Sequence, residues 1–225
     1  MPRAQRTALR VLALVTFLVS THADAQDRGH GLLAAAARGD VARVRELVSG
    51  GAALDVVDDS GRTSLLIAVA NDRGAVAQHL IEAGADINAQ AANRDSPWLL
   101  AGALGRTEML AAMLATGRVD YARRNRYGGN ALIPACERGH VATVRLLLER
   151  SAIDVDHVND LGWTALLEAV MLGDGGQRHA EIVRLLIAHG ANVSLADRHG
   201  VAPLRHARRR GYREIERMLQ AAGGR

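Results

Sequence analysis

Four side chains that could hold a metal ion lie close together between residues 154 and 160, namely those of Asp154, Asp156, His157 and Asp160. Hard cations such as Ca²⁺ take several oxygen ligands, often from one flexible loop. Asp residues are equally common in tight turns, because the carboxylate accepts hydrogen bonds from backbone N–H groups two residues further along. We therefore interpret the segment as a turn and predict neither a metal site nor a cofactor.

The residues that enzymes use for covalent chemistry are scarce in this sequence. Lysine is absent, which excludes a P-loop, a pyridoxal phosphate Schiff base and a Ser-x-x-Lys nucleophile. The patterns Gly-x-Ser-x-Gly, His-Glu-x-x-His and Cys-x-x-Cys are absent too. The single cysteine, Cys136, cannot form an internal disulfide, and we interpret it as a small core residue. The sequence predicts that the protein is not an enzyme; an enzyme with an unrecognised site is the less favoured alternative.

The elements that position these residues follow from a repeat with a period near 33 residues. Each copy reads as two helices joined by a turn and followed by a short extended finger. The first helices are expected to begin after Thr63, Ser96, Asn130, Thr164 and Ala202. Four of these five are good N-cap residues, whose side-chain oxygen accepts a free backbone N–H of the first turn. Counting back from Gly39 gives a sixth copy that starts near His30.

Glycine stands nine residues after most of these N-caps, at the turn between the two helices. The turn positions are Asp72, Gly105, Gly139, Gly173 and Gly211. Glycine adopts the positive φ of a tight helix–helix turn without steric cost. We therefore predict left-handed backbone at these positions. In the fifth copy an insertion of five residues, around Gly173–His179, lengthens the turn.

The first helix of each copy resembles the signature Thr-Pro-Leu-His-x-Ala of the ankyrin repeat family. The chain reads TSLLIA from Thr63, SPWLLA from Ser96, TALLEA from Thr164 and APLRHA from Ala202. The second-helix pattern of the family appears as VRLLIAHGA from Val183, while the signature histidine is missing. The resemblance covers roughly residues 28 to 223. It implies an all-α ankyrin-repeat solenoid of about six helix–turn–helix repeats with short β-hairpin-like fingers.

The first 25 residues have the layout of a secretory signal peptide. Three arginines precede an apolar run over residues 11–19, and Ala23-Asp24-Ala25 forms a small-x-small cleavage site. The run is too short to span a bilayer, which takes about 20 residues. We predict cleavage after Ala25 and a periplasmic or secreted protein; a frayed amphipathic N-terminus is the alternative. The mature chain would carry 25 basic and 23 acidic residues, a near-neutral balance that predicts no nucleic-acid partner.

Residues 26–225 are expected to form one ankyrin repeat domain and a monomer. In the first copy Arg43 and Glu46 stand where the middle copies have mostly apolar residues, and in the last copy Glu216 and Gln220 do so. A terminal repeat has one neighbour, so its other face meets water. The sequence therefore predicts capping repeats near residues 28–58 and 197–225.

The resemblance places a partner on the concave surface formed by the fingers and the exposed sides of the first helices. Tyr127 and Trp163 fall on adjacent fingers and have aliphatic residues beside them. Trp, Tyr and Arg are enriched at interface hot spots. We predict a protein-binding patch that consists of Arg126, Tyr127, Glu137, Arg138, Leu161, Trp163, Met171 and Leu172. The alternative is that the finger aromatics only pack against neighbouring fingers.

These observations predict a periplasmic protein-binding module without catalysis, for example an inhibitor or protector of a co-exported enzyme or toxin. The alternative is an envelope-associated scaffold that contacts anionic surfaces through a basic C-terminal helix. That helix would present Arg205, Arg208, Arg209 and Arg210. Such a run is more often a solvated face. No membrane span is predicted, and the sequence does not identify the partner.

Overall fold

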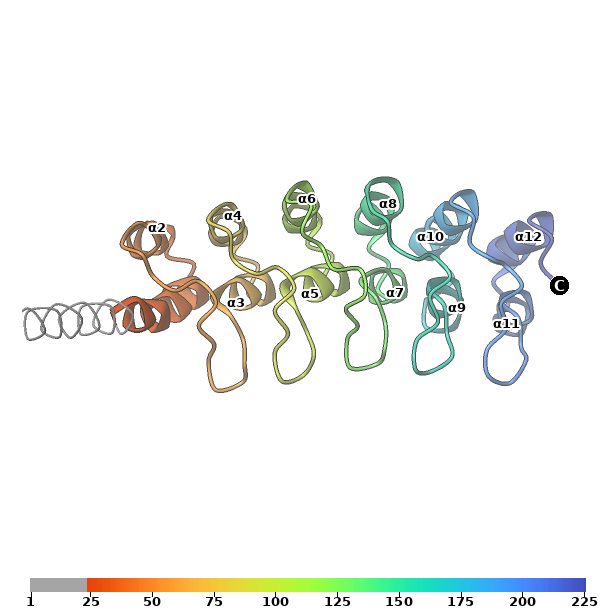
Figure 1. The fold of residues 1–225 in the computed structure, drawn as a ribbon. Helices are drawn as coiled ribbons and strands as arrows, with labels where there is room; N and C mark the ends of the chain where they lie inside the picture. The colour runs from red at the N-terminus through yellow and green to blue at the C-terminus, as the bar shows by residue number, and fades with distance from the viewer. Residues whose placement is uncertain (1–23) are drawn as a thin grey trace, which may run out of the picture. The chain divides into compact units, whose positions relative to one another are not determined.

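The computed structural model describes residues 24–225 (Figure 1). Apart from its last two residues, the predicted signal peptide lies outside this described part. The chain divides into two compact units, one ending at Asp86 and the other comprising Ile87–Arg225. Both units consist of repeats of one structural motif, a pair of helices. Within residues 24–225 no helix is both long enough and apolar enough to cross a bilayer.

The described part of the first unit begins with a helix over residues 24–38. Its other helices are α2 (Val41–Ser49), α3 (Ser64–Ala70) and α4 (Gly74–Glu82). The finger between α2 and α3 folds back on itself, since Val57 and Thr63 form an antiparallel bridge and Asp58 N–H donates to the Arg62 carbonyl at 3.1 Å. The fingers are thus hairpin-like, but the described residues form no sheet.

The second unit contains four pairs of helices. The first helices of the pairs are α5 (Pro97–Ala103), α7 (Leu132–Glu137), α9 (Ala165–Met171) and α11 (Pro203–Arg210). The second helices are α6 (Thr107–Ala115), α8 (Val141–Arg150), α10 (Gln177–Ala188) and α12 (Arg213–Ala221). Figure 1 shows that the first helices form one row and the second helices another, and that the fingers project from the first row away from the second. The predicted all-α repeat fold is confirmed.

N-capping fixes the start of the first helices as the sequence predicted, except that α7 begins one residue later than expected, at Leu132. The side-chain oxygen accepts a backbone N–H of the first turn, at 3.2 to 3.3 Å, in Thr63, Ser96 and Thr164. Asn130 Oδ1 accepts two such N–H groups, at 3.1 and 3.2 Å. Ala202 offers no side-chain cap, but α11 begins with Pro203, whose missing N–H needs no partner.

The turn prediction is confirmed at most positions and is wrong at one. The backbone is left-handed, with φ between 56° and 73°, at Asp72, Gly105, Gly139 and Gly211. In the fifth repeat the left-handed residue is Gly175 (φ 71°) rather than Gly173, because the insertion moves the turn. Gly173 is required for another reason: a Cβ there would lie 2.2 Å from the Ala169 carbonyl oxygen.

The inserted turn is tied to both neighbouring repeats. The buried His179 hydrogen-bonds to Asp174 Oδ1 through Nδ1 at 2.7 Å and to the Glu137 carbonyl through Nε2 at 2.9 Å. Tyr212 Oη donates to the Gly173 carbonyl at 2.8 Å. The insertion is therefore a packed structural connection between the helix ends on the side away from the fingers.

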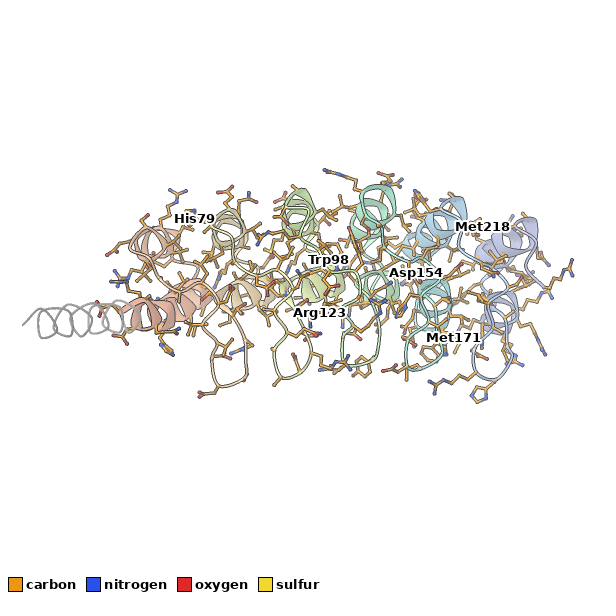
Figure 2. All side chains as sticks on the ribbon, viewed as in Figure 1. His79, Trp98, Arg123, Asp154, Met171 and Met218 are labelled. Carbon is orange, nitrogen blue, oxygen red and sulfur yellow. The ribbon has the colours of Figure 1, made fainter. Side chains whose placement is uncertain are left out.

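The core lies between the two helix rows within each unit. In the second unit Trp98 is 2% exposed and meets the Tyr121 ring edge-on, with centroids 6.0 Å apart. Figure 2 shows its side chain between the rows. Cys136 is fully buried, and burial raises the pKa of its thiol well above the usual range, so the thiol stays protonated. The prediction of a core cysteine is confirmed.

The polar residues of the terminal copies lie at the surface. Arg43 and Glu46 form an exposed ion pair at 2.7 Å beside the buried Val44 of α2. On α12, Gln220 is exposed and Glu216 accepts a hydrogen bond from Arg208 Nε at 2.8 Å. That these residues cap the stack and keep the protein a monomer stays a prediction.

Candidate binding site

Three fingers of the second unit, those before α7, α9 and α11, are held by one recurring hydrogen-bond pattern. An Asn or Asp side chain accepts the backbone N–H groups two and four residues further along, at 2.9 to 3.0 Å. The accepting residues are Asn125, Asn159 and Asp197. This turn places the residue two positions on at the fingertip, which is Tyr127, Leu161 or His199. The sequence pattern thus determines which side chains are presented.

Three predicted site residues expose large apolar side chains. Tyr127 is 50% exposed, Leu161 46% and Leu172 48%. Only two other large apolar side chains in the described chain, Val57 and Val158, are comparably exposed. Exposure of this kind is informative when the residues are contiguous. Tyr127, Leu161 and Leu172 do line one cavity, whereas Val57 and Val158 are not among its lining residues.

That cavity, here called the first groove, has a volume of about 360 Å³ and lies between the fingers and the helices α7 and α9. Six of the eight predicted residues line it: Arg126, Tyr127, Glu137, Arg138, Leu161 and Leu172. The floor is made by Ile133, Pro134 and Glu168. The structure therefore brings most of the predicted patch together.

Trp163 and Met171 lie in a different cavity. The second groove has a volume of about 620 Å³, and its lining comprises Leu161, Trp163, Met171, Asp197, Arg198, His199, Val201, His206 and Arg209. Leu161 lines both grooves and separates them. The predicted patch is thus two adjacent grooves rather than one surface.

The two arginines on the rim of the first groove are engaged by other groups. The Arg126 guanidinium lies over the Tyr127 ring, 4.9 Å from its centroid. Arg138 Nη1 donates to the Ala103 carbonyl at 2.6 Å. Both guanidinium groups line the groove, but their contacts are with a ring and a backbone carbonyl rather than with its carboxylates.

Glu168 is a site residue that the sequence analysis missed. Its side chain is 4% exposed and accepts a hydrogen bond from Asn159 Nδ2 through Oε1 at 2.9 Å. Burial and, to a smaller extent, the charge of Glu137 raise the pKa of the carboxyl to about 7, against the opposing effect of the hydrogen bond from Asn159. The signal was a Glu at an apolar position of the first helix, nine residues after the fingertip Asn.

The second groove contains a polar pair at the same repeat positions. His206 Nε2 hydrogen-bonds to Asp197 Oδ2 at 2.8 Å, and both side chains are buried. Burial opposes ionisation of Asp197, but hydrogen bonds from Val201 N–H, His206 and His199 N–H outweigh it and lower the pKa of this carboxyl. Each groove thus has a polar pair linking a finger to a first helix.

The segment from Asp154 to Asp160 forms turns. Asp154 Oδ1 accepts the Asp156 N–H at 3.1 Å, and Asp156 Oδ1 accepts the Asn192 N–H at 2.9 Å. His157 Nε2 bonds to the Gly128 carbonyl at 2.7 Å. Across residues 24–225 no three His, Cys, Asp or Glu side chains are grouped as a metal ion would require.

The basic run on α11 is only partly available to a partner. Arg208 bonds to Glu216, and Arg210 lies 5.9 Å from the Tyr212 ring centroid. Arg205 is exposed, while Arg209 lines the second groove. The run therefore does not present four free cations in one patch.

As pH rises, ionisation of Glu168 is expected to lower the stability of the wild-type protein, and Glu168→Gln is expected to abolish this decrease. The folded-state pKa near 7 lies above the ordinary 4.5, so the folded chain binds this proton more tightly than the unfolded chain. Ionisation then lowers the free energy of unfolding progressively from pH 4.5 to about 7. The variant's stability relative to wild type should rise by on the order of 1–3 kcal/mol between about pH 5 and pH 8, measured by urea unfolding. The control is Glu149→Gln, an exposed carboxylate near Arg145; a pH-independent difference for Glu168→Gln would contradict the assignment.

Comparisons with known proteins agree with this geometry. Family models described as ankyrin repeats match residues 8–91, 134–177 and 161–198. The ankyrin repeat protein YahD of Escherichia coli K12 is 40% identical over 191 residues, which are 85% of this chain and 94% of that protein. The chain therefore belongs to the ankyrin repeat family.

Solved structures show the same fold. An ankyrin repeat domain from Acinetobacter baumannii AYE is 48% identical with a TM-score of 0.84, covering 87% of this chain and 99% of that one. The ankyrin repeat domain of Bcl-3, a member of the IkappaB protein family, is 31% identical with a TM-score of 0.76 and 86% coverage of both chains. Ankyrin repeats are protein–protein interaction modules and generally non-catalytic scaffolds, and at this level the functional prediction is confirmed.

Proposed function

We propose that this protein is an exported, non-catalytic binding module that captures a protein partner on the finger side of its second unit. The observation that carries the proposal is the pair of adjacent grooves with exposed apolar residues, Tyr127, Leu161 and Leu172, in the first of them. Exposed apolar side chains cost free energy in water unless a partner covers them. Aromatic and aliphatic residues beside arginines are the composition of interface hot spots.

The partner is a protein of the periplasm, and the module acts as an inhibitor or protector of a co-exported enzyme or toxin. The support for export is the N-terminal sequence, with its arginines, apolar run and Ala23-Asp24-Ala25 site. A module without catalytic groups of its own acts by covering a surface of its partner.

The binding proposal is tested by retention of a periplasmic protein on the immobilised chain. A variant with Tyr127→Ser, Leu161→Ser and Leu172→Ser should lose the retained protein. The matched control is Val57→Ser with Val158→Ser, which changes two side chains of similar exposure outside the grooves. Retention of the same protein by the triple variant, or its loss from the control, would remove the first groove from the interface.

The export proposal predicts the mature N-terminus. Protein isolated from its native host should begin at Gln26, as read by N-terminal sequencing, because cleavage follows Ala25. It should be released by osmotic shock with other periplasmic proteins. A chain that retains Met1 and stays with the cytoplasmic fraction would overturn the localisation, but would leave the binding surface untouched.

A further inference from the structure

Two carboxylates of the first groove have no cationic partner in the described chain. Glu137 and Glu168 both line the groove. Neither takes part in an ion pair within residues 24–225, although Arg126 and Arg138 line the same groove. The Arg126 guanidinium is over Tyr127 and Arg138 bonds to the Ala103 carbonyl. The groove therefore combines apolar walls with two carboxylates that are not ion-paired with its arginines.

The Glu168 side chain is fixed in the groove by one hydrogen bond. Asn159 occupies Oε1 and fixes the side chain against the finger, which leaves Oε2 without a hydrogen bond in the described chain. A carboxylate buried to this degree usually has a charged or hydrogen-bonding partner for each oxygen. Its position on α9 faces α7, where Glu137 ends the helix.

We propose that the first groove receives a basic side chain, arginine or lysine, of the protein partner. The cationic head lies between the carboxylates of Glu137 and Glu168, and the aliphatic stem lies against Tyr127 and Leu161. This inference deepens the proposed function and rests on it for the occupant being part of a protein. A cavity of about 360 Å³ accommodates one long side chain with the apolar residues beside it.

Charge complementarity selects a basic over an acidic occupant. An acidic side chain that entered between Glu137 and Glu168 would meet two like charges, and the charge of Glu137 already raises the pKa of Glu168. Like charges in a partly desolvated groove repel strongly, whereas a cation relieves the mutual repulsion of Glu137 and Glu168. The apolar walls exclude water and strengthen the attraction.

Binding of a cation should depend on pH, since the raised pKa of Glu168 leaves much of it protonated near neutrality. Between pH 6 and pH 8 the ionised fraction changes about tenfold, and affinity should rise by up to about tenfold with it. The other charged or titratable groups on the helices packed against α9 and on the adjoining fingers are Arg126, Tyr127, Cys136, Glu137, Arg138, Arg178, His179, Glu181, Arg184, Asp197, Arg198, His199, Arg205, His206, Arg208, Arg209 and Arg210. His179 is hydrogen-bonded to Asp174 and His206 to Asp197, and neither histidine lines the first groove. A pH dependence of binding that Glu137→Gln or Glu168→Gln abolishes therefore belongs to the groove.

The test uses N-acetyl-arginine amide as the probe and N-acetyl-citrulline amide, its neutral isostere, as the matched control. Both are titrated into the full ¹⁵N-labelled chain while amide chemical shifts are followed. The arginine probe should shift the resonances of Tyr127, Leu161, Glu168 and Leu172 with a Kd in about the millimolar range, as expected for one side chain. Citrulline amide should bind at least about tenfold more weakly, because it has the shape without the charge.

Variants complete the test. Glu168→Gln and Glu137→Gln should each weaken the arginine probe severalfold, and Glu149→Gln on α8 should not. Glu137 is half-buried, so this variant keeps the test valid if Glu168→Gln unfolds the chain, which circular dichroism would show. Equal binding of the two probes, or saturation of the same resonances by N-acetyl-glutamate amide, would overturn the inference. If the arginine probe fails while the triple serine variant still loses its captured protein, the inference falls and the proposed function stands.

Discussion

Trp98→Ala is expected to lower the free energy of unfolding by about 3–5 kcal/mol. Trp98 is 2% exposed and is among the largest fully buried side chains. Its removal loses burial and leaves a cavity that α5 and α6 cannot close without moving. Tyr121 would lose its edge-on contact as well. Urea unfolding followed by circular dichroism gives the difference.

The matched control is Trp163→Ala, which removes the same side chain from the second groove. Trp163 is half-buried and solvent reaches it in the groove, so its loss should cost about 1–2 kcal/mol. The chain has two tryptophans, and each variant therefore leaves a single tryptophan, whose emission can be followed with selective excitation. The Trp163→Ala protein should emit at shorter wavelength than the Trp98→Ala protein. A larger loss of stability from Trp163→Ala would show that this ring is a core residue.

The fold could be predicted from the sequence because residues within each repeat determine where its helices begin and end. Thr63, Ser96 and Thr164 cap helices in a way that depends only on residues within one turn. The left-handed backbone of Gly175 could not be predicted, because the insertion contains several glycines and only one of them forms the left-handed turn. The choice among them depends on contacts of the turn with His179 in α10, which also bonds to the Glu137 carbonyl, and with Tyr212 from the next repeat.

The candidate site could be predicted in part. Repeat spacing identified the fingertips, and three of the exposed apolar residues followed from it. The sequence did not show that Trp163 and Met171 line a different groove from the other six predicted residues, because that depends on the position of Leu161, which lines both grooves. Glu168 was missed because its burial arises from the finger that folds over it and from α7, neither of which a single-repeat pattern describes.

The first groove should contribute most of the affinity for the captured partner. Tyr127→Ala and Leu161→Ala are each expected to weaken binding by at least about 2 kcal/mol, or roughly thirtyfold, because both side chains line the groove and are available to a partner. Each should cost about 1 kcal/mol of stability or less, since each side chain is half exposed in the free protein. Calorimetric titration and urea unfolding measure the two quantities separately.

Val158→Ala is the internal control for these two variants, since Val158 is 49% exposed and lines neither groove. Its affinity should equal that of the wild type. Trp163→Ala then decides how far the partner extends: a thirtyfold loss would mean that the partner covers both grooves, and an unchanged affinity would confine it to the first. Leu161 lines both grooves, so its truncation should be at least as costly as that of Tyr127. Wild-type affinity in Tyr127→Ala and Leu161→Ala together would show that these fingertips do not form the interface.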